Sequence, residues 1–421
     1  MDTTQNVAQR YDDLLDLYSQ HNSLYFSSPS HSLLAKPPFA QLVSERVGDI
    51  AQRAQESLSI AKQLGFADPI IMGAIGFDGE DASALRVCNN VIRQTKMPFA
   101  SSNTSGDIAF NPSQAGAHRI TPVPSGQVFK NSVNEALALF EQTPLQKVVL
   151  SRALDVQFEA APNIPLALKS LAVKNPLGYT FAVPLNAAAP ATAVGNRVLI
   201  GASPELLLSK SGKDIHIHPL AGSIARSENP NEDAQRADGL LQSAKDLYEH
   251  RVVVDAIEKS LRPFCKSLRV PRTPSLMSTA TMWHLGTHIT AELKDETLSS
   301  LALALALHPT PAVGGYPVAD AKQAIKKLEQ YPREFFTGIV GWCNAQGDGE
   351  WAITIRCAEV FNHRVRVYAG AGVVAGSCAE KEYAETAAKF NTVLNAFGVK
   401  PVKERVPKQT KSKVSEEEVH V

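Results

Sequence analysis

The order of hydrophobic and polar positions along the chain predicts many β-strands interrupted by amphipathic helices. Apolar or alternating runs that fit strands lie at residues 26–40, 69–78, 147–158, 179–185, 197–203, 205–212, 214–222, 336–345, 350–360 and 364–374. Apolar residues with helical spacing lie at residues 1–25, 39–64, 133–142, 164–175, 232–264 and 380–396. Residues 299–312 alternate Leu and Ala, which fits a strand or a helix, and the length of the run and its prolines favour a helix. Long hairpin-like runs between helices are typical of an α+β fold with large antiparallel sheets, and we expect that class.

Two polar segments stand outside this pattern. Residues 101–117 are rich in Ser, Asn and Gly and predict a flexible loop. Residues 403–421 carry mixed charge, and we expect this tail to be disordered. The 421 residues could form two or three domains or one large domain, and no internal repeat is evident.

Composition and charge exclude several classes of protein. The chain has 42 Lys and Arg against 42 Asp and Glu, and this zero balance argues against nucleic acid as a partner. No apolar run approaches the ~18–20 residues that span a bilayer, and the N-terminus is acidic where a secretory signal would be basic and then apolar. We therefore expect a cytoplasmic protein without a membrane partner. The five cysteines are widely spaced without a CxxC pair, so buried thiols are expected instead of zinc ligands or disulfides.

Two ionisable residues stand next to apolar segments. Lys147 opens an apolar strand, and Glu205 lies at a junction between strands before three leucines. Each could simply face solvent at a strand edge or in a turn. In an apolar site, the amine could instead serve as a general base, and the carboxyl could stay protonated and serve as a general acid. The residues alone leave both interpretations open.

Other candidates are acidic pairs, an arginine and glycines. Asp246 and Glu249, like Glu382 and Glu385, are three residues apart in predicted helices and share a helix face. Such faces are usually solvated, but two pairs could also converge on Mg²⁺. Arg356 stands among apolar residues of a predicted strand and could bind a carboxylate or face solvent. Gly370 and Gly372 could admit a ligand to the backbone or simply form a turn.

Seven ordered segments resemble the motifs of the chorismate-utilising enzymes. They are residues 147–152, 201–207, 218–226, 245–250, 308–315, 341–360 and 369–389. The resemblance covers residues 125–396 and is strongest to the isochorismate synthases of catecholate siderophore pathways, including SLYFSSPSHSLLA at residues 23–35. It implies one large α+β domain over residues 1–400, with two packed antiparallel sheets, helices outside them and the site in a cleft.

The resemblance also implies a role for each candidate residue in converting chorismate to isochorismate. Lys147 would activate water for attack at C2, and Glu205 would protonate the departing C4 hydroxyl. The cofactor would be Mg²⁺, gripping the ring carboxylate. Its direct ligands would be Glu249 and Glu385, and its waters would be held by Asp246 and Glu382. The substrate-binding positions would be Arg356, Lys389, Gly370 and Gly372 at the enolpyruvyl carboxylate, and Ala221, Gly222 and Ser223 under the ring carboxylate.

Three positions bear on the reaction within the family. Ala221 stands where aminodeoxychorismate-type enzymes often have a nucleophilic lysine, and anthranilate-type enzymes lack a lysine at the position of Lys147, so water is the expected nucleophile. Phe336 stands where salicylate synthases commonly have tyrosine, which favours an enzyme that stops at isochorismate. The alternatives are a salicylate synthase, a menaquinone-pathway isochorismate synthase and a subunit that binds a glutaminase. The intact set of site residues disfavours the last, and we expect no glutaminase partner.

Overall fold

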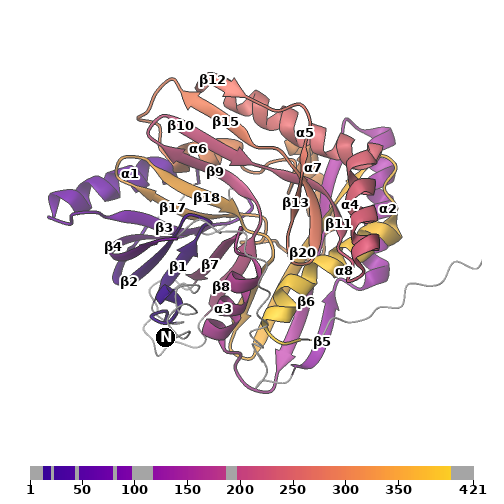
Figure 1. Cartoon of the computed structure of the whole chain (residues 1–421), viewed down its shortest axis with the longest axis horizontal. Helices are drawn as coiled ribbons and strands as arrows, with labels where there is room; N and C mark the ends of the chain where they lie inside the picture. Colours follow the sequence, from indigo (N-terminus) through magenta and orange to yellow (C-terminus); the bar gives the residue numbers. More distant parts are fainter. Residues whose placement is uncertain are drawn as a thin grey trace, which may run out of the picture.

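A computed structural model of the chain describes residues 13–19, 23–42, 47–78, 83–96, 117–185 and 197–399, which form an α+β fold as expected (Figure 1). Most of the predicted helix at residues 1–25, residues 101–116 of the predicted loop and the predicted tail at 403–421 lie outside these residues. The helix prediction was wrong for residues 24 and 25, which belong to a strand. The helices are α1 (Val47–Gln63), α2 (Gly126–Gln142), α3 (Ile164–Lys174), α4 (Pro230–Gln242), α5 (Ala244–Leu261), α6 (Ser300–Leu307), α7 (Val318–Leu328) and α8 (Ala379–Ala396), with a short 3₁₀ turn η2 (Asp13–Leu15).

The strands are β1 (Leu24–Ser27), β2 (His31–Gln41), β3 (Ile70–Ile75), β4 (Ser83–Thr95), β5 (Ala117–Val123), β6 (Lys147–Phe158), β7 (Tyr179–Pro184), β8 (Arg197–Ser203), β9 (Leu206–Ser211), β10 (Asp214–His218), β11 (Leu220–Ala225), β12 (Cys265–Arg269), β13 (Ser275–Ser278), β14 (Met282–Gly286), β15 (Ile289–Leu293), β16 (Gly315–Tyr316), β17 (Ile339–Asn344), β18 (Gly349–Ile353), β19 (Cys357–Phe361) and β20 (Arg364–Val374). Seventeen of these strands are connected in one antiparallel sheet.

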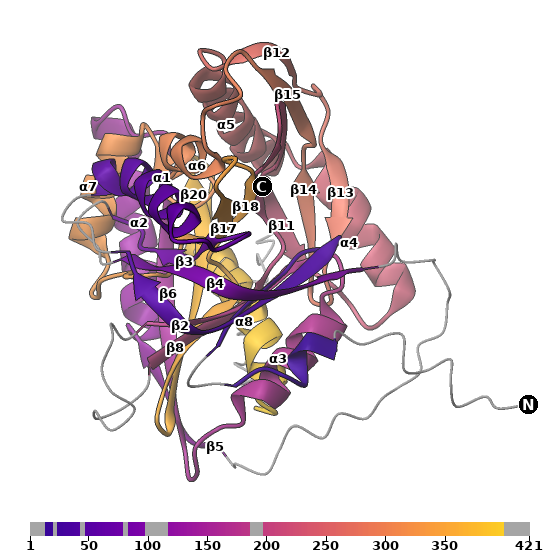
Figure 2. The same ribbon diagram turned by 90° about the vertical axis from the view of Figure 1, so that its left-hand side faces the viewer.

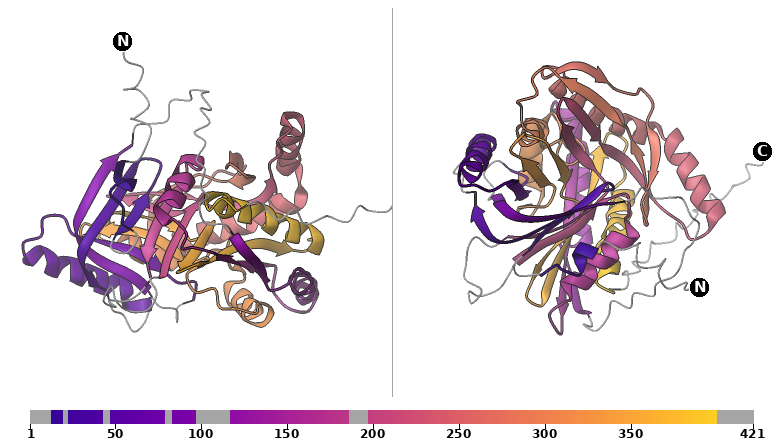
Figure 3. Two further views of the ribbon diagram at one scale, coloured as in Figure 1. Left: turned by 90° about the horizontal axis from the view of Figure 1, so that it is seen from below. Right: turned by 60° about the vertical axis from the view of Figure 1, so that its left-hand side comes forward.

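The large sheet folds back on itself. Its strands pair in the order β12-β15-β10-β9-β18-β17-β3-β4-β2-β1-β7-β8-β19-β20-β6-β5, and β16 pairs with the start of β6. Val340 of β17 and Met72 of β3 share one apolar core with Phe181 of β7 and Leu199 of β8. The two packed layers are therefore halves of one hydrogen-bonded sheet, whose curvature Figure 3 shows from two further sides. A separate sheet has the order β11-β14-β13.

Helices cover the outer faces of both layers. Residues of α1, α5 and α6 pack with β3, β9, β10 and β15, and Figure 2 shows α1 beside β3. Residues of α3 and α8 pack on β6, β8 and β20, and those of α2 and α7 pack on β6. Strands between the core and the helices, such as β3 and β6, thus bury side chains on both faces. None of the described helices combines the length and the apolar run needed to cross a bilayer.

Three predicted elements are divided or displaced. The helix predicted over residues 232–264 is two helices, because Ser243 ends α4 and its hydroxyl accepts the Asp246 backbone N–H at 3.3 Å as the N-cap of α5. The strand predicted over 214–222 divides between two sheets around Pro219, which has no N–H to donate. The helix predicted from residue 39 begins at Val47, because residues 39–41 continue β2.

The strand predicted over residues 350–360 is also interrupted. β18 ends at Ile353 and β19 begins at Cys357, and between them Arg356 has a φ of 50° in the left-handed region. An L-residue at this φ cannot continue a strand. The prediction of Arg356 inside a strand was therefore wrong, and the residue instead occupies a bend.

Candidate active site

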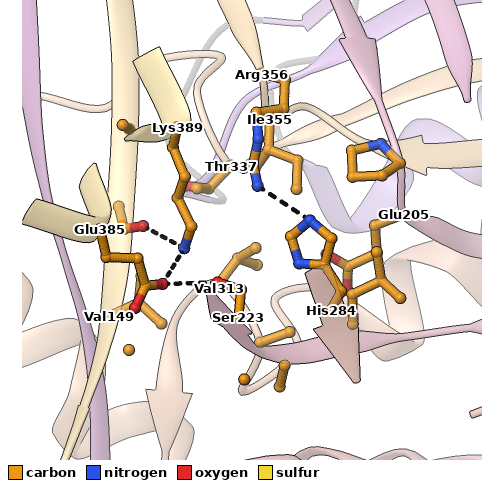
Figure 4. A pocket seen from close by; sticks show the side chains of 18 of the residues that line it. Val149, Glu205, Ser223, His284, Val313, Thr337, Ile355, Arg356, Glu385 and Lys389 are labelled. Atoms are coloured by element: carbon orange, nitrogen blue, oxygen red, sulfur yellow. Dashed lines mark hydrogen bonds and ion pairs between the residues drawn. The ribbon is translucent and has the colours of Figure 1, made fainter. Parts of the chain in front are cut away.

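A pocket lies where β6, β11 and β20 meet the helices α5 and α8. Its free space, including the open mouth, is about 600 Å³. Ten of the thirteen predicted site residues line it, and Figure 4 shows several of them around this space. They are Glu205, Ala221, Gly222, Ser223, Glu249, Arg356, Gly370, Gly372, Glu385 and Lys389. Segments far apart in the chain thus come together as the resemblance implies, while the role of each residue stays a prediction.

Glu205 lies at the pocket wall between β8 and β9. Its side chain is buried, and its backbone N–H donates to Ser203 Oγ at 3.2 Å. Burial raises the pKa of the Glu205 carboxyl from 4.5 to about 7, although the Leu220 N–H and the charges of Lys147, Arg356 and Lys389 favour the carboxylate. A large fraction of this group is therefore protonated at neutral pH, as a general acid requires.

Arg356 is a buried cation with unused hydrogen-bonding capacity. Its Nη2 lies 3.4 Å from His284 Nε2 (Figure 4), and its Nε has no hydrogen-bond partner within the described chain. Burial lowers the pKa of Arg356 to about 10, opposed by the charges of Glu385 and Glu205, so the guanidinium stays charged at neutral pH. Burial and the Arg356 charge hold the pKa of His284 well below 6.5, which keeps this ring neutral. A buried cation with a free donor favours binding of an anion.

Glu385 of α8 joins the floor of the pocket to a second cation. It accepts a hydrogen bond from Ser223 Oγ at 2.8 Å, and Lys389 Nζ lies 2.6 Å from the same oxygen (Figure 4). Lys389 also donates to the Gly370 carbonyl at 2.9 Å. Burial raises the pKa of Glu385, but Lys389, Lys245 and the bond from Ser223 outweigh it, so the net pKa is lowered. Glu385 is therefore an ionised carboxylate.

The floor beneath the pocket is formed by β11 and held by a neutral histidine. His250 Nδ1 lies 3.1 Å from the Ala221 carbonyl, and its Nε2 lies 2.7 Å from Thr287 Oγ1. Burial lowers the pKa of His250 to about 4, so the ring is neutral at ordinary pH. Gly222 has a φ of 79°, and a Cβ there would lie only 3.1 Å from Asp246 Cβ. The β11 bend thus fits against the first turn of α5.

Lys147 lies behind the pocket and does not line it. Its side chain is fully buried, and its Nζ is 3.0 Å from Glu249 Oε1. This is an ion-pair distance, but the two atoms do not have the angles of a hydrogen bond. Lys147 Nζ therefore has no hydrogen-bond partner in the described part of the chain. A Cβ at Gly372 would lie 2.0 Å from Glu249 Oε1 and 3.3 Å from Lys147 Cε. Gly372 therefore makes room for the ion pair; it also lines the pocket, and binding of a ligand at its backbone stays a prediction.

Three of the four acidic residues lie within 4 Å of Lys245, and the charge of the fourth, Glu385, also acts on this lysine. Its Nζ is 3.1 Å from Glu382 Oε1, 3.6 Å from Asp246 Oδ1 and 3.8 Å from Glu249 Oε2. Burial, reinforced by the charge of Glu385, raises the pKa of Glu382 to about 7, and burial also raises that of Asp246. Asp246 and Glu382 do not line the pocket, and no group of three or more potential ligand side chains among the described residues converges on one metal position.

Of the opposite wall, the sequence interpretation singled out only Phe336 and the motif that contains Val313. Here Tyr368 stacks on Phe336 with ring centroids 5.1 Å apart, next to Thr337, Val313 and His284. Val313 belongs to the motif at residues 308–315, and Phe336 is the position compared with the tyrosine of salicylate synthases, so the resemblance marked these two residues but not their contacts. Tyr368 and His284 carried no such signal, because each lies in a strand whose pattern predicts only a buried position.

Comparisons with known proteins agree with this arrangement. The family described as chorismate binding enzyme matches residues 66–398. The chain is 45% identical over 386 residues to isochorismate synthase DhbC of Bacillus subtilis, covering 90% of this chain and 94% of that protein. It is 38% identical over 389 residues to the vibriobactin-specific isochorismate synthase of Vibrio cholerae, covering 92% and 94%.

A solved structure shows the same fold. It is a Bacillus anthracis protein described as a 2,3-dihydroxybenzoate-specific isochorismate synthase, DhbC, with a TM-score of 0.85 and 42% identity over 92% of this chain and 99% of that one. Pocket, motifs and relatives agree, and the chain belongs to the chorismate-binding enzyme family.

Proposed function

We propose that this protein is an Mg²⁺-dependent isochorismate synthase that converts chorismate to isochorismate for siderophore biosynthesis of the 2,3-dihydroxybenzoate type. The observation that carries the proposal is a pocket in which a buried, largely protonated carboxyl, Glu205, shares the space with a buried cation, Arg356. The names of the relatives from Bacillus and Vibrio support the same reaction and pathway.

Recognition of a substrate with two carboxylates requires positive charge at separate places. Arg356 has a free Nε donor, and Lys389 of α8 lines the same pocket (Figure 4). We assign Arg356, Lys389 and the backbone at Gly370 and Gly372 to the enolpyruvyl carboxylate, while Mg²⁺ would supply the positive charge at the ring carboxylate. The β11 backbone at Ala221, Gly222 and Ser223 would lie under the ring carboxylate. Because the Arg356 guanidinium is buried, its attraction for an anion is screened less than at a surface.

The reaction exchanges one oxygen on the ring for another and needs one proton removed and one supplied. Water adds at C2 and gives a proton to Lys147, the double bonds shift, and the C4 hydroxyl leaves as water with a proton from Glu205. The product is an isomer of the substrate, so no oxidant or reductant is needed. Glu205 is suited to its part because its pKa of about 7 keeps a proton available at neutral pH.

The acidic residues fit a hard cation. Carboxylate oxygens are the ligands Mg²⁺ prefers, and its sites often use one or two carboxylates with waters and substrate oxygens, so a tight set of three side chains is not required. Glu382 Oε2 is buried without a hydrogen-bond partner in the described chain, which marks unfilled acceptor capacity beside Lys245. Glu249 and Glu385 would hold the ion, with Asp246 and Glu382 orienting its waters. Bound there, Mg²⁺ would supply positive charge for the ring carboxylate.

One incubation tests the reaction. Purified protein is given chorismate and Mg²⁺, with and without ammonium, and products are separated by liquid chromatography with mass detection. We expect isochorismate alone under both conditions. Release of salicylate and pyruvate would contradict the proposal in favour of a lyase. An aminated product, or none without a partner, would contradict it in favour of a subunit that depends on a glutaminase.

Matched variants test the two proton-transfer roles. Lys147→Ala and Glu205→Gln should abolish turnover and leave the circular dichroism spectrum unchanged. Lys210→Ala removes another buried lysine, 3.0 Å from Asp348 and outside the pocket, and should stay active. Glu350→Gln is the matching control for Glu205→Gln. Burial raises the pKa of the Glu350 carboxyl to about 7 as well, but this residue lies outside the pocket. Full activity in Lys147→Ala or Glu205→Gln would refute the assigned role.

A further inference from the structure

A buried ion pair lies behind the pocket wall and takes no part in the proposed chemistry. Arg333 and Glu329 follow α7, and their side chains are 2% and 3% exposed. Arg333 Nε donates to Glu329 Oε2 at 2.9 Å and Nη2 donates to Glu329 Oε1 at 2.6 Å, a bidentate geometry. Neither residue lines the pocket. Removing two charges from water is costly, so such a pair is a poor source of stability by itself.

The other donors of Arg333 all reach residues of the pocket wall. Its Nη2 donates to the Val149 carbonyl at 2.6 Å, and its Nη1 donates to the Val313 carbonyl at 2.8 Å and to Thr337 Oγ1 at 3.2 Å. With the two bonds to Glu329, the five N–H donors of the guanidinium are matched by five acceptor contacts. Val149, Val313 and Thr337 come from three separate segments, and all three line the pocket.

The partner carboxylate ties the same wall to the strand of Lys147. Glu329 Oε1 accepts the Ser151 backbone N–H at 2.8 Å, and the Val149 N–H donates to the Gly314 carbonyl at 2.9 Å. The ion pair therefore holds β6 at Val149 and Ser151, and the loop that contains Val313 makes a further hydrogen bond to Val149. Lys147 begins this strand, two residues before Val149.

The segment after Arg333 is conformationally demanding. Thr337 has a φ of 59°, which a β-branched residue rarely adopts, so surrounding contacts must impose it. Its N–H donates to the Thr354 carbonyl at 2.8 Å, its carbonyl lies 2.8 Å from His308 Nε2, and its hydroxyl meets Arg333. Thr354 lies two residues before Arg356, so this segment also borders the bend that carries the anion-binding cation.

We propose that the Arg333–Glu329 pair is a positioning element that holds the pocket segments at Val313 and Thr337 against β6 at Val149, and thereby sets the distance between Lys147 and the bound substrate. This inference rests on the proposed function for its catalytic consequence. Neither residue touches the substrate: the guanidinium fork holds two backbone carbonyls and a hydroxyl in one geometry. A lysine would keep the charge, but its single ammonium cannot make the same planar set of contacts.

Arg333→Lys is the main test, and Arg366→Lys is its matched control. Arg366 also forms a bidentate pair, with Asp155 on the same strand β6 at 2.7 and 2.8 Å, but it does not line the pocket. Below the unfolding temperature, we expect Arg333→Lys to lower kcat/KM for chorismate by about 100-fold, as a small misplacement of reacting groups does. Most of the loss should be in kcat, because Arg356 and Lys389 still bind the substrate. Arg366→Lys should keep the wild-type values.

A second variant and a second measurement keep the inference testable if Arg333→Lys does not fold. Glu329→Gln keeps the shape of the side chain and removes its charge. Like Arg333→Lys, it should lower kcat. Hydrogen exchange without substrate should become faster in peptides covering residues 147–152, 308–315 and 333–338 of the Arg333 or Glu329 variant, and not in Arg366→Lys. Wild-type kcat and KM in a folded variant with unchanged exchange would overturn the proposal, even if its melting temperature fell.

The exchange measurement also separates this proposal from the proposed function. If the wild-type protein does not convert chorismate, the function fails; faster exchange confined to the three segments would still support the positioning role. If the wild type is active and exchange in these segments is unchanged in the variants, the positioning role fails and the function stands.

Discussion

At the scale of single residues, burial gives Glu205 a property that its sequence neighbours only suggest. Three leucines after a carboxyl fit a solvent-facing turn as well as an apolar site. The structure shows the buried position, and burial raises the pKa to about 7 despite three nearby cations. An ordinary glutamate would be almost entirely ionised at neutral pH and could not donate a proton.

This pKa predicts an alkaline limb in the activity profile. Because the protonated form is the acid, kcat/KM should be level below pH 7 and fall about tenfold per pH unit well above it. Rates measured between pH 5.5 and about 9 check the limb. Glu350→Gln should leave it in place, because Glu350 has a similarly raised pKa outside the pocket. A profile that stays level to the alkaline end would show that Glu205 is not the acid.

Gly372 has a reason to be glycine besides the predicted one. The prediction that it admits a ligand to the backbone still stands, and the space that a Cβ would occupy is taken by the Glu249 carboxylate. We predict that Gly372→Ala displaces this carboxylate from Lys147, because a Cβ cannot lie 2.0 Å from an oxygen. Turnover should drop at least about 100-fold.

A glycine at which an added Cβ would meet no other atom provides the control for Gly372→Ala. Gly239 in α4 has open space at its Cβ, so Gly239→Ala should be active and slightly more stable, as alanine favours helix. Steady-state rates and chemical unfolding of both variants measure these effects. An active Gly372→Ala protein would mean that the Lys147–Glu249 contact is dispensable for the reaction.

At the scale of elements, the sequence predicted the kinds of elements well and their ends less well. Strands with continuous apolar runs, such as β6 and β20, lie close to where the pattern placed them. β4 was missed, because only its first half is buried on both faces. The breaks at Ser243 and Arg356 depend on a side-chain cap and a left-handed φ, which hydrophobic periodicity does not register.

The break at Ser243 predicts an effect on the acidic cluster. Its hydroxyl caps the first turn of α5, which carries Lys245, Asp246 and Glu249. Ser243→Ala should lower the free energy of unfolding by about 1 kcal/mol and raise the Mg²⁺ concentration needed for half-maximal activity. Denaturant titration and magnesium titration measure the two effects.

A second helix cap tests whether this effect is local. Ser125 caps α2, accepting the Val128 N–H at 3.4 Å, and does not line the pocket. Ser125→Ala should lose a similar free energy of unfolding and keep the wild-type magnesium requirement. Equal magnesium requirements in both cap variants would show that the α5 cap does not organise the cluster.

At the scale of the whole molecule, equal numbers of acidic and basic residues conceal a strongly charged interior. The balance of 42 against 42 excludes a generally basic surface but says nothing of where charges gather. The structure collects Glu249, Glu385 and Glu382 around the ammonium of Lys245 beside the pocket. Physical reasoning identified these acids only as two helix pairs. That the two helices lie side by side follows from the fold. The family resemblance implied this fold, whereas hydrophobic periodicity could not.

This concentration of negative charge predicts that Mg²⁺ stabilises the folded protein, because the unfolded chain separates the acids. At a concentration about 100 times its dissociation constant, the ion should add about 2.7 kcal/mol and raise the melting temperature. The shift should vanish in the Glu249→Gln, Glu385→Gln double variant and persist in Glu350→Gln. Thermal unfolding with magnesium, and after its removal by a chelator, measures this without requiring turnover. An equal shift in all three proteins would mean that the ion acts elsewhere on the surface, and that the two helix pairs do not form its site.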